Sequence, residues 1–181
     1  MHRIFGLLVA AGLVFAGAGT PSIPNFHQVD ANIYRGAQPA PQEFQSLARL
    51  GIKTVLDLRD EQSHARAERK LVEAAGMRYI SVPMKGMVTP TEQQISRALA
   101  VMEDTSHGPI FVHCRRGADR TGTVIACYRI AHDQWLNEKA LEEARTLGMS
   151  WIERGMRSYV LGYRSPIVTT APGAPASAPA R

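Results

Sequence analysis

The stretch that decides the fold is Ile110-Phe111-Val112-His113-Cys114-Arg115-Arg116-Gly117-Ala118-Asp119-Arg120-Thr121-Gly122. It opens with apolar and β-branched residues that are typical of a buried strand. A short loop follows, with a cysteine at its start and an arginine at its end, where a helix is expected to begin. The stretch therefore predicts a strand, a loop and a helix in direct succession.

The residue types of this loop favour the binding and attack of a phosphate group. Its backbone N–H groups can form an anion-binding nest, to which the helix N-terminus adds its dipole. The same field lowers the pKa of a cysteine, so Cys114 is a candidate nucleophile near neutral pH. Arg120 offers a planar fork for two phosphate oxygens. Gly117 suits a positive φ or a close backbone approach to the anion, and Thr121 can donate its hydroxyl to the sulfur.

The expected substrate-binding residues are those of the loop itself, namely Arg115, Arg116, Gly117, Ala118 and Thr121. Two alternatives stay open for the cations Arg115 and Arg116, together with Lys85. They either broaden an anionic pocket or form ordinary solvated surface.

Helix and strand patterns alternate on both sides of this loop. Helices are expected at 41–50, 61–75, 89–102, 120–132, 137–147 and 151–163, strands at 52–58, 77–82 and 109–113, and a small hairpin at 26–34. This alternation predicts an α/β domain with a central, mostly parallel sheet flanked by helices. Ligands of such sheets bind at the carboxyl ends of the strands, which is where the cysteine loop begins.

The start of the helix expected at 89–102 carries a capping pattern. Thr89 fits the N-cap position, Pro90 the first helical position and Glu92 the third, which together form a capping box. We therefore expect the carboxylate of Glu92 to be engaged at this helix start.

Composition places the chain among globular proteins. It has 181 residues, of which 45% are hydrophobic, so one compact domain with a sizeable core is expected. The formal net charge is +5, but the basic residues are interleaved with acidic ones and form no patch with aromatic residues between them. We therefore expect no nucleic-acid partner.

The two ends of the chain differ from the rest. Met1-His2-Arg3 precedes an uncharged run that ends at Ala18, which is typical of a signal peptide over 1–18. Membrane contact would then arise only through an uncleaved leader acting as an anchor. The expected catalytic domain covers 19–164, and residues 165–181, rich in Pro and Ala, are expected to form a disordered tail. These features predict an exported protein, periplasmic or secreted.

The pattern His-Cys-x-x-Gly-x-x-Arg-Thr-Gly at 113–122 resembles the signature of the cysteine-dependent protein tyrosine and dual-specificity phosphatases. The resemblance extends to the plant-and-fungal type of atypical dual-specificity phosphatases and their bacterial relatives. Further matches are Ile33-Tyr34-Arg35, Gln38-Pro39, the segment 50–59, Tyr128-Arg129 and Trp135. The similar region covers about 26–148, most of the expected mature chain.

The resemblance implies a two-step phosphatase reaction that needs no metal and no cofactor. Cys114 attacks phosphorus, a phosphocysteine forms, and water releases phosphate. The implied substrate is a phosphorylated protein or a phosphorylated inositol or lipid. Two alternatives remain, which are a rhodanese-like sulfurtransferase and a phosphate-binding module without catalysis.

The general acid of such families is usually an aspartate on a separate loop, and here this sequence departs from the pattern. Residues 83–90 contain no Asp or Glu. Asp119 resembles the aspartate that myotubularin lipid phosphatases carry before the arginine of the signature. Asp60 and Glu61, just after the strand expected at 52–58, are rivals. Asp119 could instead orient Arg120 or cap the helix.

Two further residues near the loop are expected to have structural roles. Cys127 is expected to pack in the core, and His113 to support the loop by a hydrogen bond. The histidines show no metal-ligand spacing, so no metal site is expected.

Overall fold

The computed structural model of the chain describes residues 20–60 and 62–165. The predicted leader at 1–18, the candidate acid Glu61 and all of the predicted tail except Ser165 lie outside the described residues. Within the described ranges, no helix is long and apolar enough to cross a bilayer.

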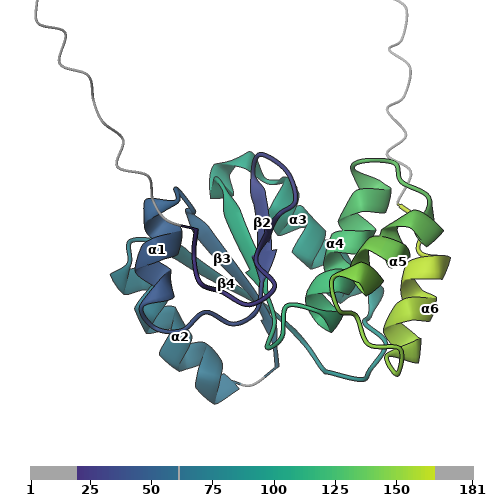
Figure 1. Cartoon of the computed structure of the whole chain (residues 1–181), viewed down its shortest axis with the longest axis horizontal. Helices are drawn as coiled ribbons and strands as arrows, with labels where there is room; N and C mark the ends of the chain where they lie inside the picture. Colours follow the sequence, from purple (N-terminus) through teal and green to yellow (C-terminus); the bar gives the residue numbers. More distant parts are fainter. Residues whose placement is uncertain (1–19, 61, 166–181) are drawn as a thin grey trace, which may run out of the picture.

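A five-stranded sheet forms the centre of the domain (Figure 1). Its strands are β1 (His27–Gln28), β2 (Ile33–Gly36), β3 (Thr54–Arg59), β4 (Arg78–Met84) and β5 (Ile110–His113). They lie in the order β1-β2-β5-β3-β4, with β1 antiparallel to β2 and the other neighbours parallel. The predicted mostly parallel sheet and the predicted hairpin are thereby confirmed.

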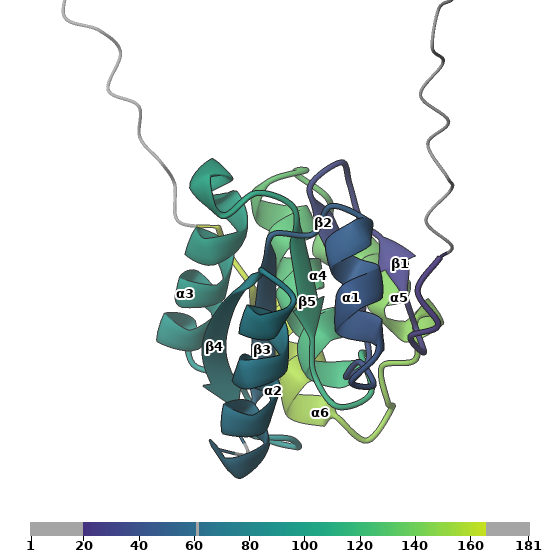
Figure 2. The same ribbon diagram turned by 90° about the vertical axis from the view of Figure 1, so that its left-hand side faces the viewer.

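Helices cover both faces of this sheet. They are α1 (Glu43–Arg49), α2 (Gln62–Ala74), α3 (Glu92–Glu103), α4 (Asp119–Ala131), α5 (Asn137–Thr146) and α6 (Arg154–Gly162), with a short 3-10 turn η1 (Thr105–His107) before β5. Helices α1 and α2 lie on one face, as the turned view of Figure 2 shows, and α3 and α4 lie on the other. Helices α5 and α6 pack against α4 on its outer side (Figure 1).

The alternation of side chains along β3 divides the core into two layers. Leu56 and Leu58 belong to the cluster that includes Val124 of α4, whereas Val55 belongs to the cluster that includes Phe44 of α1. Because successive residues of a strand point to opposite faces, one strand supplies both layers. The central position of β3 and β5 follows from this two-sided burial.

Three helices end at glycines, as the sequence predicts. Gly51, Gly76 and Gly148 follow α1, α2 and α5 with φ values of +97°, +78° and +90°. A left-handed residue after the last helical turn satisfies its free carbonyl groups, and glycine adopts that conformation without strain. These stops fix where the following strand or loop begins.

The predicted start of α3 is wrong by two residues. Thr91, and not Thr89, is the N-cap, and the capping box pairs it with Gln94 instead of Glu92. The Thr91 Oγ1 accepts the Gln94 N–H at 3.2 Å, and the Gln94 Oε1 accepts the Thr91 N–H at 2.9 Å. Two overlapping capping patterns exist in this segment, and the second one is used. Glu92 is an exposed first-turn residue outside the box.

Candidate active site

The predicted strand, loop and helix are present in direct succession. Strand β5 ends at His113, the loop runs from Cys114 to Ala118, and α4 begins at Asp119. Cys114 is only 2% exposed, and Ala118 is buried at the N-cap position of α4. The carboxyl end of a central parallel strand and the N-terminus of a helix therefore meet at the cysteine.

The surroundings of Cys114 favour its thiolate. Burial by itself would raise the pKa of this thiol, but hydrogen bonds from the hydroxyl and the backbone N–H of Thr121 lower it. The charge of Arg120 and the backbone N–H of Arg116 act in the same direction, so the pKa lies below that of an ordinary cysteine. The Thr121 hydroxyl is buried and has no partner at ordinary hydrogen-bond geometry among the described residues, so it is free to donate to the sulfur.

Gly117 is held in place from behind the loop. Its φ is +69°, as predicted, and a Cβ atom at this position would lie 2.3 Å from the carbonyl carbon of Gly36. The close approach is thus to β2. The Gly117 carbonyl accepts hydrogen bonds from Arg35 Nη2 at 2.6 Å and from Asn25 Nδ2 at 3.0 Å. These two donors fix the carbonyl away from the anion-binding side.

Arg35, on β2, is a buried cation that the sequence reasoning noted only as part of the resemblance. It is 1% exposed, and burial lowers its pKa to about 10, against the opposing charges of Glu143 and the Cys114 thiolate. It therefore remains a cation at neutral pH behind the loop. Its role in this arrangement is to hold the loop backbone.

Arg120 is oriented by the ends of two strands. Its Nη1 donates to the Met84 carbonyl at 3.2 Å and to Asp60 Oδ1 at 3.4 Å. The predicted rival acid Asp60 therefore lies against this arginine. The contact places the guanidinium at the carboxyl end of the sheet, beside the loop.

Both carboxylate oxygens of Asp119 are engaged as acceptors. Oδ1 accepts the backbone N–H of Ser150 at 2.8 Å, and Oδ2 accepts Arg116 Nη2 at 2.5 Å. The side chain of Arg116 is 62% exposed in this ion pair, and Arg115 is also exposed. Asp119 thus joins the catalytic loop to the segment between α5 and α6.

A cavity of about 270 Å³ opens over the loop. Its lining residues are Gly86, Met87, Cys114, Arg115, Arg116, Asp119, Arg120, Ile152 and Glu153. The predicted Cys114, Arg120 and Asp119 are thus brought together with both loop cations. Met87, Ile152 and Glu153 are not among the predicted site residues, because they come from distant loops with no motif of their own.

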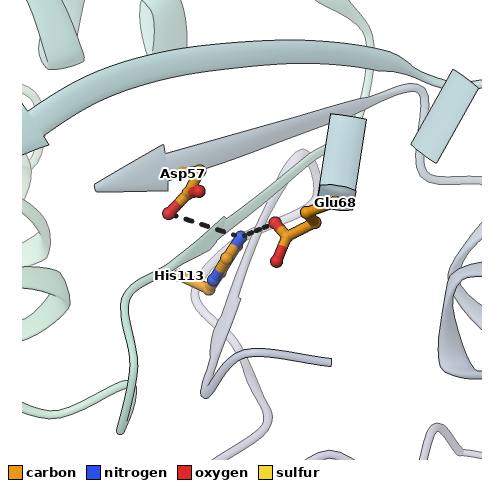
Figure 3. Close-up of side chains that lie close together, drawn as sticks. All are labelled: Asp57, Glu68 and His113. Atoms are coloured by element: carbon orange, nitrogen blue, oxygen red, sulfur yellow. Dashed lines mark ion pairs between the residues drawn. The ribbon is translucent and has the colours of Figure 1, made fainter. Parts of the chain in front are cut away.

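A buried polar network lies beneath the loop on the α2 side of the sheet (Figure 3). His113 Nε2 lies 2.7 Å from Glu68 Oε1 and 3.9 Å from Asp57 Oδ1. Arg59 Nη2 contacts both carboxylates at 2.6 Å, and Tyr79 donates to Asp57 at 2.7 Å. Burial alone would lower the pKa of His113, but Glu68 and Asp57 raise it. The predicted support of the loop by His113 is present as a contact of 3.3 Å between its Nδ1 and the Cys114 carbonyl oxygen, while Nε2 faces Glu68 of α2.

This network also contains the residue types that could bind a metal ion. The ligand atoms of Asp57, Glu68 and His113 lie within 4.8 Å of one another. Arg59, however, bridges the two carboxylates, and His113 Nε2 lies 2.7 Å from Glu68 Oε1, so both carboxylates already have side-chain partners. The cluster fits a structural support for β3 and β5 better than a cation site.

Cys127 has the predicted core position. It is fully buried among the residues between the sheet and α3 and α4, and burial raises its pKa. Neither Cys114 nor Cys127 is in a disulfide.

Fold and site together define a class. A thiol of lowered pKa at the end of a parallel strand, an anion-binding loop and an arginine at the helix start form the site of cysteine-dependent phosphatase domains. The chain belongs to the family described as "DSP-PTPase phosphatase fused to NAD+ Kinase", whose model matches residues 20–156. The resemblance to dual-specificity phosphatases is confirmed.

Individual relatives agree with this assignment. The chain is 28% identical to inositol diphosphatase DSP3 of Arabidopsis thaliana, over 73% of this chain and 66% of the relative. It is 31% identical to dual specificity protein phosphatase TpbA of Pseudomonas aeruginosa, over 74% of this chain and 59% of the relative. The matches span 66% or less of the lengths of these two relatives.

A solved structure shows the same arrangement. A TpbA variant from P. aeruginosa with serine in place of cysteine, in complex with pTyr, superposes with a TM-score of 0.67 at 29% identity. The superposition covers 84% of this chain and 92% of that one.

Proposed function

We propose that this chain hydrolyses phosphate monoesters through a phosphocysteine intermediate. The observation that carries the proposal is the environment of Cys114, a buried thiol whose pKa is lowered by Thr121 against the effect of burial. Membership in a phosphatase family supports it. A sulfurtransferase and a non-catalytic module have no comparable support.

The geometry supports a two-step reaction. The loop N–H groups and Arg120 hold the phosphoryl oxygens while Cys114 Sγ attacks phosphorus and the ester oxygen leaves with a proton. Water then attacks phosphorus, the S–P bond breaks, and phosphate is released. The Thr121 hydroxyl stabilises the sulfur as it leaves.

The residues at the rim of the cavity indicate which class of substrate the site favours. Met87 is 73% exposed and Ile152 47%, and both line the cavity beside the exposed Arg115. Their sequence neighbours Val88 and Trp151 are also exposed apolar residues. An apolar rim around an anion site suits a phosphate on an apolar or aromatic group, so we propose phosphotyrosine ahead of phosphoserine, phosphothreonine and phosphorylated inositols or lipids.

The test is phosphate release by the purified protein from phosphopeptides, phosphoinositides and inositol phosphates in the presence of a metal chelator. Cys114→Ser is expected to abolish turnover while substrate binding persists, and vanadate is expected to inhibit the wild type. Cys127→Ala, which removes the buried thiol, serves as the matched control and should retain activity. Wild-type turnover by Cys114→Ser would exclude the mechanism, and thiosulfate turnover without phosphate release would favour sulfur transfer.

We also propose that the protein is exported. The support is the basic start and apolar run of residues 1–18. Sequencing the N-terminus of the protein from its native cell is expected to give Gly19 in a fraction outside the cytoplasm. An intact Met1 in the cytosol would contradict the proposal.

A further inference from the structure

The loop after β4, where the general acid of such phosphatases is expected, contains no carboxylic acid. Strand β4 leads into residues 85–90, from which Gly86 and Met87 line the cavity. No residue of this loop is a carboxylic acid. A proton for the leaving group must come from another element that reaches the same cavity.

Asp119 and Asp60, the two predicted candidate acids that the structure describes, both accept hydrogen bonds. Asp119 accepts one hydrogen bond at each oxygen, from Ser150 N–H and from Arg116. Asp60 lies against Arg120, which also holds the Met84 carbonyl. The carboxylate oxygens of these two residues are thus already engaged by groups of the site itself.

Glu153 is in a different situation. It precedes α6, is 6% exposed and lines the same cavity as Cys114 and Arg120. Burial raises its pKa, and the nearby carboxylate of Asp119 raises it further. The Met87 N–H and the cations Arg116 and Arg120 act in the opposite direction. A buried carboxyl beside a second carboxylate is the usual arrangement of a catalytic acid.

The position of Glu153 is fixed by close packing on the acid-free loop. A Cβ atom at Gly155 would lie 2.3 Å from Thr89 Oγ1, so only a glycine lets the start of α6 approach residues 85–90 this closely. The Asp119 hydrogen bond to Ser150 anchors the same segment to the catalytic loop. Two independent contacts thus hold residues 150–155 over the cavity.

We infer that Glu153 is the general acid of the reaction, supplied by the α5–α6 connection instead of the loop after β4. The inference rests on the proposed phosphatase function. As the Sγ–P bond forms and the P–O bond breaks, the proton of the Glu153 carboxyl passes to the leaving oxygen. In the second step the Glu153 carboxylate takes a proton from the attacking water, which restores the acid while the S–P bond breaks.

The test compares two substrates in three variants of the full chain. Glu153→Gln is expected to slow hydrolysis of phenyl phosphate, a poor leaving group, by ~10²-fold or more, and p-nitrophenyl phosphate far less. Asp119→Asn, which keeps an oxygen for the Ser150 N–H, is expected to show a much smaller difference between the two substrates than Glu153→Gln. Glu138→Gln, an exposed carboxyl on α5, is the matched control and should change neither rate.

The pH profile supplies a second readout. The groups that face Glu153 are Asp119, Arg116 and Arg120, together with the Cys114 thiolate in the same cavity. With phenyl phosphate, kcat/KM of the wild type is expected to fall at high pH as Glu153 loses its proton, and this descending limb is expected to disappear in Glu153→Gln. Vanadate binding by the variant shows that the pocket remains folded.

The outcomes separate the two proposals. Equal losses for both substrates in Glu153→Gln, or a leaving-group dependence in Asp119→Asn alone, would overturn the assignment of the acid and leave the phosphatase mechanism standing. If Glu153→Gln does not fold, Glu153→Asp, which keeps the carboxyl, provides the same comparison with a smaller expected loss. Turnover that is independent of Cys114 would instead overturn the proposed function.

Discussion

Gly117 shows how one residue controls the shape of the catalytic loop. Its positive φ and its contact with Gly36 leave no room for a side chain, while Arg35 and Asn25 hold its carbonyl. With the carbonyl turned away, the N–H groups of the loop remain on the side of the anion. The loop is therefore preorganised before any substrate binds.

Gly117→Ala is expected to reduce kcat/KM for an aryl phosphate by about 10²-fold or more, because the Cβ atom displaces the loop from Gly36. Steady-state kinetics with p-nitrophenyl phosphate measure the effect. Gly162→Ala is the matched control, since a Cβ atom there meets nothing within 4 Å. Normal turnover in Gly117→Ala would show that the loop tolerates the displacement.

At the scale of elements, a network of buried charged and polar side chains links α2 to β3 and β5. Glu68 comes from α2, Asp57 from β3 and His113 from β5 (Figure 3). Arg59 of β3 joins them, and all four side chains are buried. Removing one member of a buried charge network leaves another charge without its partner. The network therefore links the packing of α2 to the residue that precedes the nucleophile.

Glu68→Gln is expected to destabilise the fold by about 3–5 kcal/mol, the usual cost of breaking a buried pair. Urea unfolding at neutral pH measures this change. Glu73→Gln, an exposed residue of the same helix in a loose pair with Arg69, should change stability by less than about 1 kcal/mol. A loss as small as that of the control would mean that Glu68 is dispensable.

The same network predicts a dependence of stability on pH. Despite its burial, His113 has its pKa raised by Glu68 and Asp57. Its contribution to stability is therefore fully present below the unfolded-state pKa, about 6.5, and is lost as pH rises through the folded-state value. Urea unfolding from pH 6 upward is expected to show this decline in the wild type and a smaller one in Glu68→Gln. Equal slopes in both proteins would contradict it.

At the scale of the whole molecule, the sheet separates two apolar layers within the part of the chain that the structure describes. The buried hydrophobic residues run from Ile23 to Val160. Residues of β3 belong to both layers, since Leu56 and Leu58 lie in one and Val55 in the other. Neither layer can therefore form without the sheet. This arrangement indicates that the domain folds as a unit.

A chain shortened to residues 20–165 is expected to unfold within about 2 °C of the full-length protein, because it keeps every buried hydrophobic residue that the structure describes. Thermal unfolding followed by circular dichroism compares the two forms. Retained turnover of an aryl phosphate would show that the site is complete as well. A markedly lower Tm would mean that residues beyond this range contribute to the core.

Much of the fold could be predicted from local patterns, since glycine stops such as Gly51 and the strand, loop and helix around Cys114 are encoded by neighbouring residues. The start of α3 could not be predicted in this way, because two capping patterns overlap in the sequence. Thr91 serves as the N-cap, while Thr89 packs against Gly155. The role proposed for Glu153 could not be predicted from its neighbours in the sequence either. Its burial and its place in the cavity arise only when α6 folds back on the catalytic loop.

The placement of Cys127 has a consequence for redox chemistry. The thiolate is the form of cysteine that oxidants convert to a sulfenic acid, which a neighbouring thiol can rescue as a disulfide. The sequence has two cysteines, and the second is buried between the sheet and α4 with a raised pKa. Since Cys127 is not among the residues that line the cavity, we expect an oxidised Cys114 to be rescued only by thiols from outside this chain.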